Sequence, residues 1–184
     1  MNVLASRGQL RASFFRWALL TVPAVLLLGF LSGRAAPGGA ENRWFMSLDM
    51  PDIMPPFWAF PLAWTILYLL MGIALALVCA AWGARGRAIA ITAFIVQLLV
   101  NVTWNPVFFG MRDIEMALMI IGILDLLVII TIVLFWRVRR LAALLLLPYL
   151  AWILFATVLN WQFLELNPNA SSSGDGSAVQ RVEL

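Results

Sequence analysis

Amide and aromatic side chains recur at helical spacing within strongly apolar stretches of the chain. The candidate ligand-binding residues form three groups, namely Trp64 and Tyr68; Asn101, Trp104 and Phe108; and Trp152, Ala156 and Asn160. In the third run, Gln97, Asn101 and Asn105 are four positions apart and form one amide stripe on a helix, with Trp104 and Phe108 beside it. The other two groups have the same spacing of four. Flat aromatic walls with a few hydrogen-bonding groups suit a flat, largely apolar ligand. The alternative is plain packing, in which the amides join neighbouring helices and the indoles fill space or lie at the membrane surface.

A single ionisable residue, Asp125, lies in the middle of an apolar run. Acidic residues within a membrane are costly and often mark a proton path or a ligand contact. The competing interpretation is structural: a protonated Asp125 that is hydrogen-bonded to Thr131 or to a neighbouring helix.

The composition excludes most conventional catalytic and metal sites. The chain has no His and no Lys, and Cys79 is its only cysteine. An intrachain disulfide, Cys/His zinc sites, Ser-His triads and a His-ligated haem are therefore excluded. The sequence predicts no catalytic residues, no metal site and no obligatory cofactor.

The chain is too apolar for a soluble domain. Of its 184 residues, 64% are hydrophobic and 11% are charged, whereas soluble domains have about 45–50% and about 25%. The apolar runs are Phe14–Leu31, Phe57–Trp82, Ala88–Phe109, Ile114–Trp136 and Leu141–Leu164. Each is close to the roughly 20 residues that a membrane-spanning helix needs, and none alternates as a barrel strand would. The predicted fold is an all-α integral membrane protein, a five-transmembrane-helix bundle over residues 14–166.

The segments outside these runs define the remaining organisation. Residues 1–13 form a basic N-terminus, residues 32–56 a long first loop, and residues 167–184 a tail rich in Ser and Gly that we expect to be disordered. An alternative for the first run is a cleaved signal peptide, which would leave four helices.

The arginines indicate the orientation of the bundle. Eight of them fall on one side: Arg7, Arg11, Arg16, Arg85, Arg87, Arg137, Arg139 and Arg140. The positive-inside rule then predicts a cytoplasmic N-terminus, with the first loop and the C-terminus outside. The net charge of +3 is therefore an orientation signal and does not indicate nucleic-acid binding. The sequence leaves open whether the membrane is an inner or an outer one.

Three ordered motifs resemble a known family. Residues 55–72 (PPFWAFPLAWTILYLLMG) resemble the PPxWxFPxxWTxLYxxMG signature of the translocator protein/tryptophan-rich sensory protein family. Residues 101–110 (NVTWNPVFFG) resemble its NxxWxPxFFG segment, and residues 148–152 (PYLAW), followed by Leu159-Asn160, resemble its PYLxW…LN segment. The resemblance covers about residues 44–167.

The resemblance implies a five-helix bundle, often dimeric, with a pocket that opens toward the long first loop. Members of the family bind porphyrins such as protoporphyrin IX and haem, synthetic isoquinolines and benzodiazepines and, in animals, cholesterol. The family's pocket residues correspond to Trp64, Asn101 and Trp152. The implied partners are the lipid bilayer, a porphyrin or another flat hydrophobic molecule, and a second copy in a homodimer.

The first loop departs from the family pattern. Phe45 replaces a Tyr, Met50 replaces a Lys, and Asp52-Ile53 replace a Trp. Because this loop is expected to cover the pocket, ligand choice is expected to differ; Arg34 and Arg43 are the remaining cations for a porphyrin propionate. Trp161 and Glu165 occupy the positions where the sterol segment of animal members has a Tyr and a basic residue, so specific sterol recognition is not supported.

Three functional hypotheses follow. The first is a receptor or carrier for porphyrins and related ligands, with a regulatory or transport role. The second is light- or oxygen-dependent porphyrin breakdown, for which the sequence offers no acid–base pair, nucleophile or metal site. The third is a proton-coupled transporter with Asp125 as the proton carrier, although five helices cannot divide into two equal inverted repeats.

Overall fold

A computed structural model describes residues 7–170 of the chain. Five apolar helical segments are long enough to cross a membrane, which confirms the predicted helix count and the absence of strands among the described residues. The long helices are α1 (Arg7–Ala35), α3 (Ala59–Cys79), α4 (Arg87–Asn105), α5 (Ile114–Val138) and the pair α6 (Arg140–Leu145) and α7 (Leu147–Leu166). The helix α1 extends into the basic N-terminal segment, because residues such as Gln9 and Arg11 favour helix as much as the apolar residues do.

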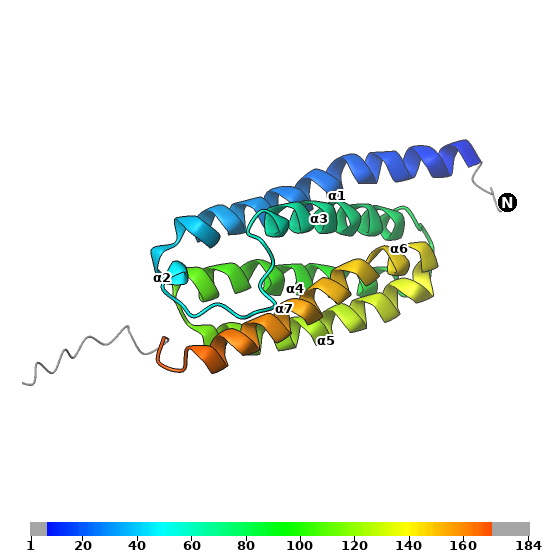
Figure 1. Cartoon of the computed structure of the whole chain (residues 1–184). Coiled ribbons are helices and arrows are strands. Elements are labelled where there is room, and N and C mark those ends of the chain that lie inside the picture. The colour runs from blue at the N-terminus through cyan, green and yellow to red at the C-terminus, as the bar shows by residue number, and fades with distance from the viewer. Residues whose placement is uncertain (1–6, 171–184) are drawn as a thin grey trace, which may run out of the picture.

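The helices pack as a ring whose order in space differs from their order in the sequence, and α3 also contacts α4 across this ring. The helix α1 packs along α3, α3 contacts α6 and α7, these contact α5, α5 packs along α4, and α4 returns to α1 (Figure 1). The contact between α3 and α7 is much less extensive than that between α1 and α3. The ring is therefore tightly closed at α1–α3 and loosely closed at α3–α7.

Glycine allows the close approach of α1 and α3. A Cβ atom at Gly72 would lie 2.7 Å from Val22 Cα, and Thr21 Oγ1 donates to the carbonyl oxygen of Gly72 at 2.8 Å. A Cβ atom at Gly29 would overlap the ring of Tyr68. A Cβ atom at Gly33, one turn after Gly29, would have no described atom within 4 Å.

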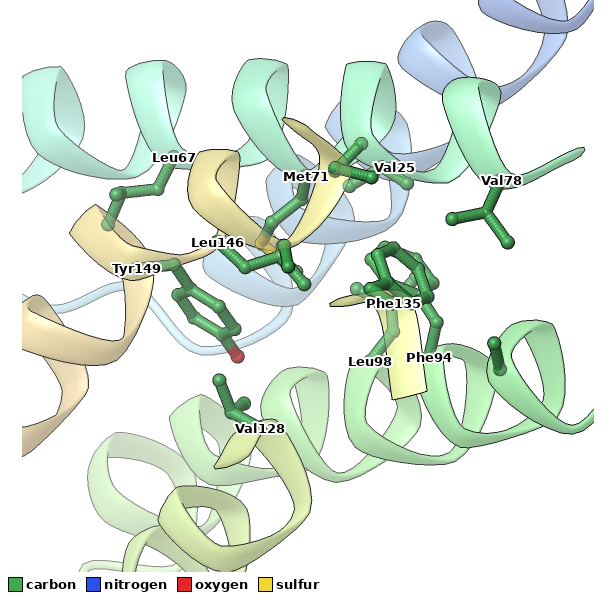
Figure 2. Close-up of a cluster of buried hydrophobic side chains, with 14 of the residues drawn as sticks. Val25, Leu67, Met71, Val78, Phe94, Leu98, Val128, Phe135, Leu146 and Tyr149 are labelled. Atoms are coloured by element: carbon green, nitrogen blue, oxygen red, sulfur yellow. The ribbon is translucent and has the colours of Figure 1, made fainter. Parts of the chain in front are cut away.

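A central core fills the bundle between these helices. Its buried members include Val25 of α1, Met71 of α3, Phe94 of α4, Phe135 of α5 and Tyr149 of α7 (Figure 2). The rings of Phe94 and Phe135 stack at 5.7 Å with an interplanar angle of 16°. The core thus takes side chains from every span and fixes their rotation about their own axes.

Two prolines interrupt the helices. Pro106 follows α4 and begins a π-helical turn, η2 (Pro106–Gly110), and Pro148 lies at the start of α7, after the break that separates it from α6. Proline lacks the N–H that would continue the helical hydrogen bonds. The third and fifth long segments nevertheless remain single candidate spans, because η2 continues α4 and α7 continues α6 in one direction.

The first loop folds back over one end of the bundle, here named the loop end. It contains η1 (Gly39–Glu41) and the short helix α2 (Arg43–Met46) (Figure 1). The starts of α3 and α5 and the ends of α1, α4 and α7 meet at this end. Residues 167–170 follow α7, and the rest of the predicted disordered tail lies outside the described residues.

Candidate ligand-binding site

Trp64, Tyr68 and Asn101 come together on the inner faces of α3 and α4. The Tyr68 hydroxyl donates to Asn101 Oδ1 at 2.9 Å, and the rings of Trp64 and Tyr68 stack at 5.2 Å with an interplanar angle of 26°. Asn101 is 5% exposed, so its amide is shielded from lipid. A buried amide oxygen needs such a partner because an unpaired polar group is costly there.

A second tyrosine–amide pair lies beside this one. The Tyr149 hydroxyl of α7 donates to Gln97 Oε1 of α4 at 3.0 Å, and the Tyr149 ring meets Trp64 edge-on at 6.4 Å. Gln97 belongs to the amide stripe of the third apolar run, whereas the spacing of residues in the sequence does not indicate Tyr149. The two pairs make an inner wall of alternating aromatic and amide groups, here named the Tyr–amide wall (Trp64, Tyr68, Gln97, Asn101 and Tyr149).

Trp104, Phe108 and Asn160 form a separate cluster nearer the loop end. Trp104 Nε1 donates to Asn160 Oδ1 at 3.1 Å, and Asn160 Nδ2 donates to the carbonyl oxygen of Ile114 at 3.0 Å. The rings of Trp104 and Phe108 stack at 5.0 Å. Asn160 thus joins α7 to α4 and α5, as the packing interpretation of the amides predicted.

The first loop closes over this cluster through Phe45. Its ring is 3% exposed and lies 6.2 Å from Phe108 and 5.3 Å from Phe163, measured between ring centroids. A tyrosine at this position would bring a hydroxyl into an apolar cluster. The departure of Phe45 from the family pattern is therefore compatible with a more apolar cover over the bundle end.

Two asparagines hold the loop in place. Asn42 Nδ2 donates to the carbonyl oxygens of Pro37 and Phe109. Asn167, just after α7, accepts from the backbone N–H of Asp49 at 2.9 Å and donates to its carbonyl oxygen at 3.0 Å. The paired bonds of Asn167 fasten the loop to the end of the fifth span.

An apolar groove lies between α3 and α7, where the helix ring is loosely closed. It has a volume of about 590 Å³, and its lining is Pro55, Ala63, Ile66, Leu67, Pro148, Ala151, Trp152 and Phe155. Trp152 meets Phe60 edge-on at 5.9 Å, so its indole spans from α7 to α3. We name this feature the α3–α7 groove. Its lining includes Trp152 but not the Tyr–amide wall, which packs behind it.

The structure thus divides the predicted site residues. Trp64, Tyr68 and Asn101 belong to the Tyr–amide wall, Trp104, Phe108 and Asn160 to the loop-end cluster, and Trp152 to the groove. Ala156 is partly buried on α7, one turn from Trp152. Among residues 7–170, no three His, Cys, Asp or Glu side chains come together as a metal site would require.

Comparison with known proteins identifies the family of the chain. The model of the TspO/MBR family matches residues 21–166. The chain belongs to the TspO/MBR family. It is 37% identical to the tryptophan-rich protein TspO of Chlorobaculum tepidum over 150 aligned residues. The alignment covers 81% of this chain and 94% of that relative. It is 40% identical over 149 residues to the tryptophan-rich sensory protein of Cereibacter sphaeroides, over 78% of this chain and 92% of that protein.

The similarity extends to animals. The translocator protein of Homo sapiens is 35% identical over 136 residues, which is 73% of this chain and 80% of the human protein. The family that the three motifs indicated is therefore confirmed. The chain is a multi-pass integral membrane protein of this family.

Proposed function

We propose that this TspO/MBR member is a receptor or carrier that binds porphyrins and related flat, apolar molecules in the α3–α7 groove, with a regulatory or transport role. The observation that carries the proposal is the groove itself: every side chain that lines it is apolar, and Trp152 offers it an indole. A planar ring system gains both from burial of apolar surface and from stacking on an aromatic side chain. The names of the sensory and translocator relatives fit such a role.

The groove and the surrounding helices divide the work of binding. Ala63 and Ala151 leave room between α3 and α7, while Phe155 and Trp152 supply flat surface. The Tyr–amide wall behind the groove keeps the inner faces of α3, α4 and α7 in register through its two hydrogen bonds. Binding then needs little rearrangement, which lowers its entropic cost.

The polar edge of a porphyrin is expected to face the loop end. The groove reaches Pro55, in the last part of the first loop. Arg34 near the end of α1 and Arg43 at the start of α2 are exposed at this end of the bundle. A guanidinium pairs well with a carboxylate, so these arginines are the candidates for propionate contacts. Because the chain has no His, binding is expected to depend little on iron.

We place the loop end outside the cytoplasm. The loops at the opposite end carry Arg85, Arg87, Arg137, Arg139 and Arg140, and positive charge favours the cytoplasmic side. A ligand that arrives from the bilayer or from the outer surface would then reach the groove without crossing the basic face. Cysteine labelling with a membrane-impermeant reagent at position 52 or position 85 would establish the orientation.

Titration of the purified protein with protoporphyrin IX tests the proposal. We expect quenching of tryptophan fluorescence and a shifted Soret band at micromolar ligand, with similar results for the iron complex. Trp152→Leu should weaken binding at least several-fold. Trp161→Leu is the matched control, because Trp161 lies on the same helix and is 49% exposed outside the groove. Unchanged spectra for the native protein, or equal effects of the two substitutions, would refute the proposal.

The same titration separates binding from porphyrin breakdown. A receptor leaves the total porphyrin absorbance constant in the dark and, after correction for photobleaching in free solution, under light. A loss of absorbance that depends on Trp152 would instead indicate the degrading activity.

A further inference from the structure

Asp125 contacts a neighbouring span rather than its own helix. Its Oδ2 atom lies 2.8 Å from Thr157 Oγ1, which joins α5 to α7. Thr131, the other partner considered from the sequence, donates instead to the carbonyl oxygen of Leu127 on its own helix. Thr157 lies on α7 between Trp152 of the groove and Asn160 of the loop-end cluster.

The hydroxyl of Thr157 has two acceptors within reach but only one proton. Its Oγ1 atom is 2.9 Å from the carbonyl oxygen of Ile153 and 2.8 Å from the carboxyl of Asp125. Thr65 and Thr131 donate in the same way to the carbonyl oxygen four residues earlier, which supports donation from Thr157 to Ile153. If Thr157 donates to Ile153, a proton on Asp125 Oδ2 makes the short contact with Thr157 Oγ1 a second full hydrogen bond.

The second oxygen of Asp125 supports the same assignment. Asp125 Oδ1 is buried and has no hydrogen-bond partner among the residues that the structure describes. A carboxylate would share its negative charge with this unpaired oxygen, whereas a neutral acid would leave there only a carbonyl. Leaving an uncharged acceptor unpaired costs far less than leaving a charge unpaired.

In the part of the chain that the structure describes, the groups around Asp125 provide no counter-charge. Along α5, the nearest arginines are Arg112, before the helix, and Arg137, near its end, about 18–20 Å away at 1.5 Å per residue. The charged residues of the helices packed against α5 are Arg87, Arg140 and Glu165, all in terminal turns of α4, α6 and α7. Within residues 7–170, the other ionisable groups of the interior are Tyr149 on α7, Tyr68 on α3 and Cys79 at the end of α3. Both tyrosines donate to amides of α4.

We infer that Asp125 is a proton-binding site in the membrane interior, held as a neutral carboxylic acid that donates to Thr157 and so joins α5 to α7. Loss of the proton would leave an unpaired charge and one hydroxyl proton for two acceptors, so the α5–α7 contact is expected to weaken. Because Thr157 lies five positions after Trp152, the proton is placed to affect the helix that carries the groove. The inference rests on these contacts and not on the proposed function.

Infrared difference spectroscopy of the full chain in lipid tests the inference. The native protein minus Asp125→Asn at neutral pH is expected to show the C=O stretching band of a protonated carboxylic acid. Thr157→Val should shift this band because it removes the acceptor, whereas Thr157→Ser should leave it near its native position. Each variant is first checked for native helicity by circular dichroism.

The outcomes are distinct. An acid band that depends on Asp125 and responds to Thr157→Val supports the assignment. A carboxylate band in place of the acid band at neutral pH would overturn it, as would an acid band that Thr157→Val leaves unchanged. If Asp125→Asn fails to fold, the comparison of the Thr157 variants with the native protein still decides whether an acid band responds to the loss of this hydroxyl. The measurement needs no porphyrin, so its result is independent of whether the groove binds one.

Discussion

A methyl group added at Gly29 should disturb the Tyr–amide wall, although Gly29 lies on α1 and is not part of the wall. The Cβ atom of Gly29→Ala would overlap the ring of Tyr68, which stacking on Trp64 and the hydrogen bond to Asn101 hold in place. Overpacking of this kind costs about 1–3 kcal/mol, and loss of the Tyr68–Asn101 bond adds about 1 kcal/mol. Alanine has a higher helix propensity than glycine, which offsets this loss of stability by about 1 kcal/mol. The net expectation is a loss of about 1–3 kcal/mol of stability.

Gly33→Ala is the matched control on the same helix. Its Cβ atom would have nothing within 4 Å, so only the gain in helix propensity, up to about 1 kcal/mol, remains. Equilibrium unfolding in mixed SDS micelles, followed by circular dichroism, compares the two variants with the native protein. If Gly29→Ala proves as stable as Gly33→Ala, the packing of Tyr68 against α1 is wrong.

Three further predictions concern the hydrogen bonds around the site. Tyr68→Phe leaves Asn101 Oδ1 without its donor and should lower stability by about 1 kcal/mol in the same unfolding assay; an unchanged unfolding curve would contradict this. Asn160→Leu removes the acceptor of Trp104 Nε1 and the donor to Ile114 and should cost about 1–3 kcal/mol, more than the exposed Val158→Ala. Asn167→Ala frees the first loop and should raise its amide hydrogen exchange over residues 47–52, whereas Pro168→Ala should not; equal exchange in both would show that Asn167 does not hold the loop.

The number of spans and much of the polar interior could be predicted from residue type and spacing. Long apolar runs without alternation permit only helices in lipid, and helical spacing placed Trp64 beside Tyr68 and Trp104 beside Phe108. These are local relations along one helix. They do not depend on how the helices are arranged in the ring.

The partners across helices could not be predicted in the same way. Gln97, Asn101 and Asn105 form one stripe in sequence, but their partners lie on three helices: Tyr149 on α7, Tyr68 on α3, and the carbonyl oxygens of Ser32 and Ala36 at the end of α1. Which helix faces each amide depends on the ring order, and no periodicity encodes that order.

Most residues that line the groove could not be predicted from the sequence either. Ala63, Ile66 and Ala151 are ordinary apolar residues, and their types do not distinguish a groove wall from a surface that contacts lipid. Trp152 was the exception, since an indole in the middle of a span is unusual enough to be noticed. The groove exists because α3 and α7 meet only slightly, which is a property of the assembled bundle.

Filling the groove tests the central claim most directly. Ala151→Phe places a ring in the α3–α7 groove, whereas Leu154→Phe places one on the lipid-facing side of the same helix, where Leu154 is 45% exposed. In a titration with protoporphyrin IX, we expect Ala151→Phe to weaken binding at least tenfold and Leu154→Phe to bind like the native protein. Native affinity in Ala151→Phe, with the protein folded, would show that the ligand binds elsewhere.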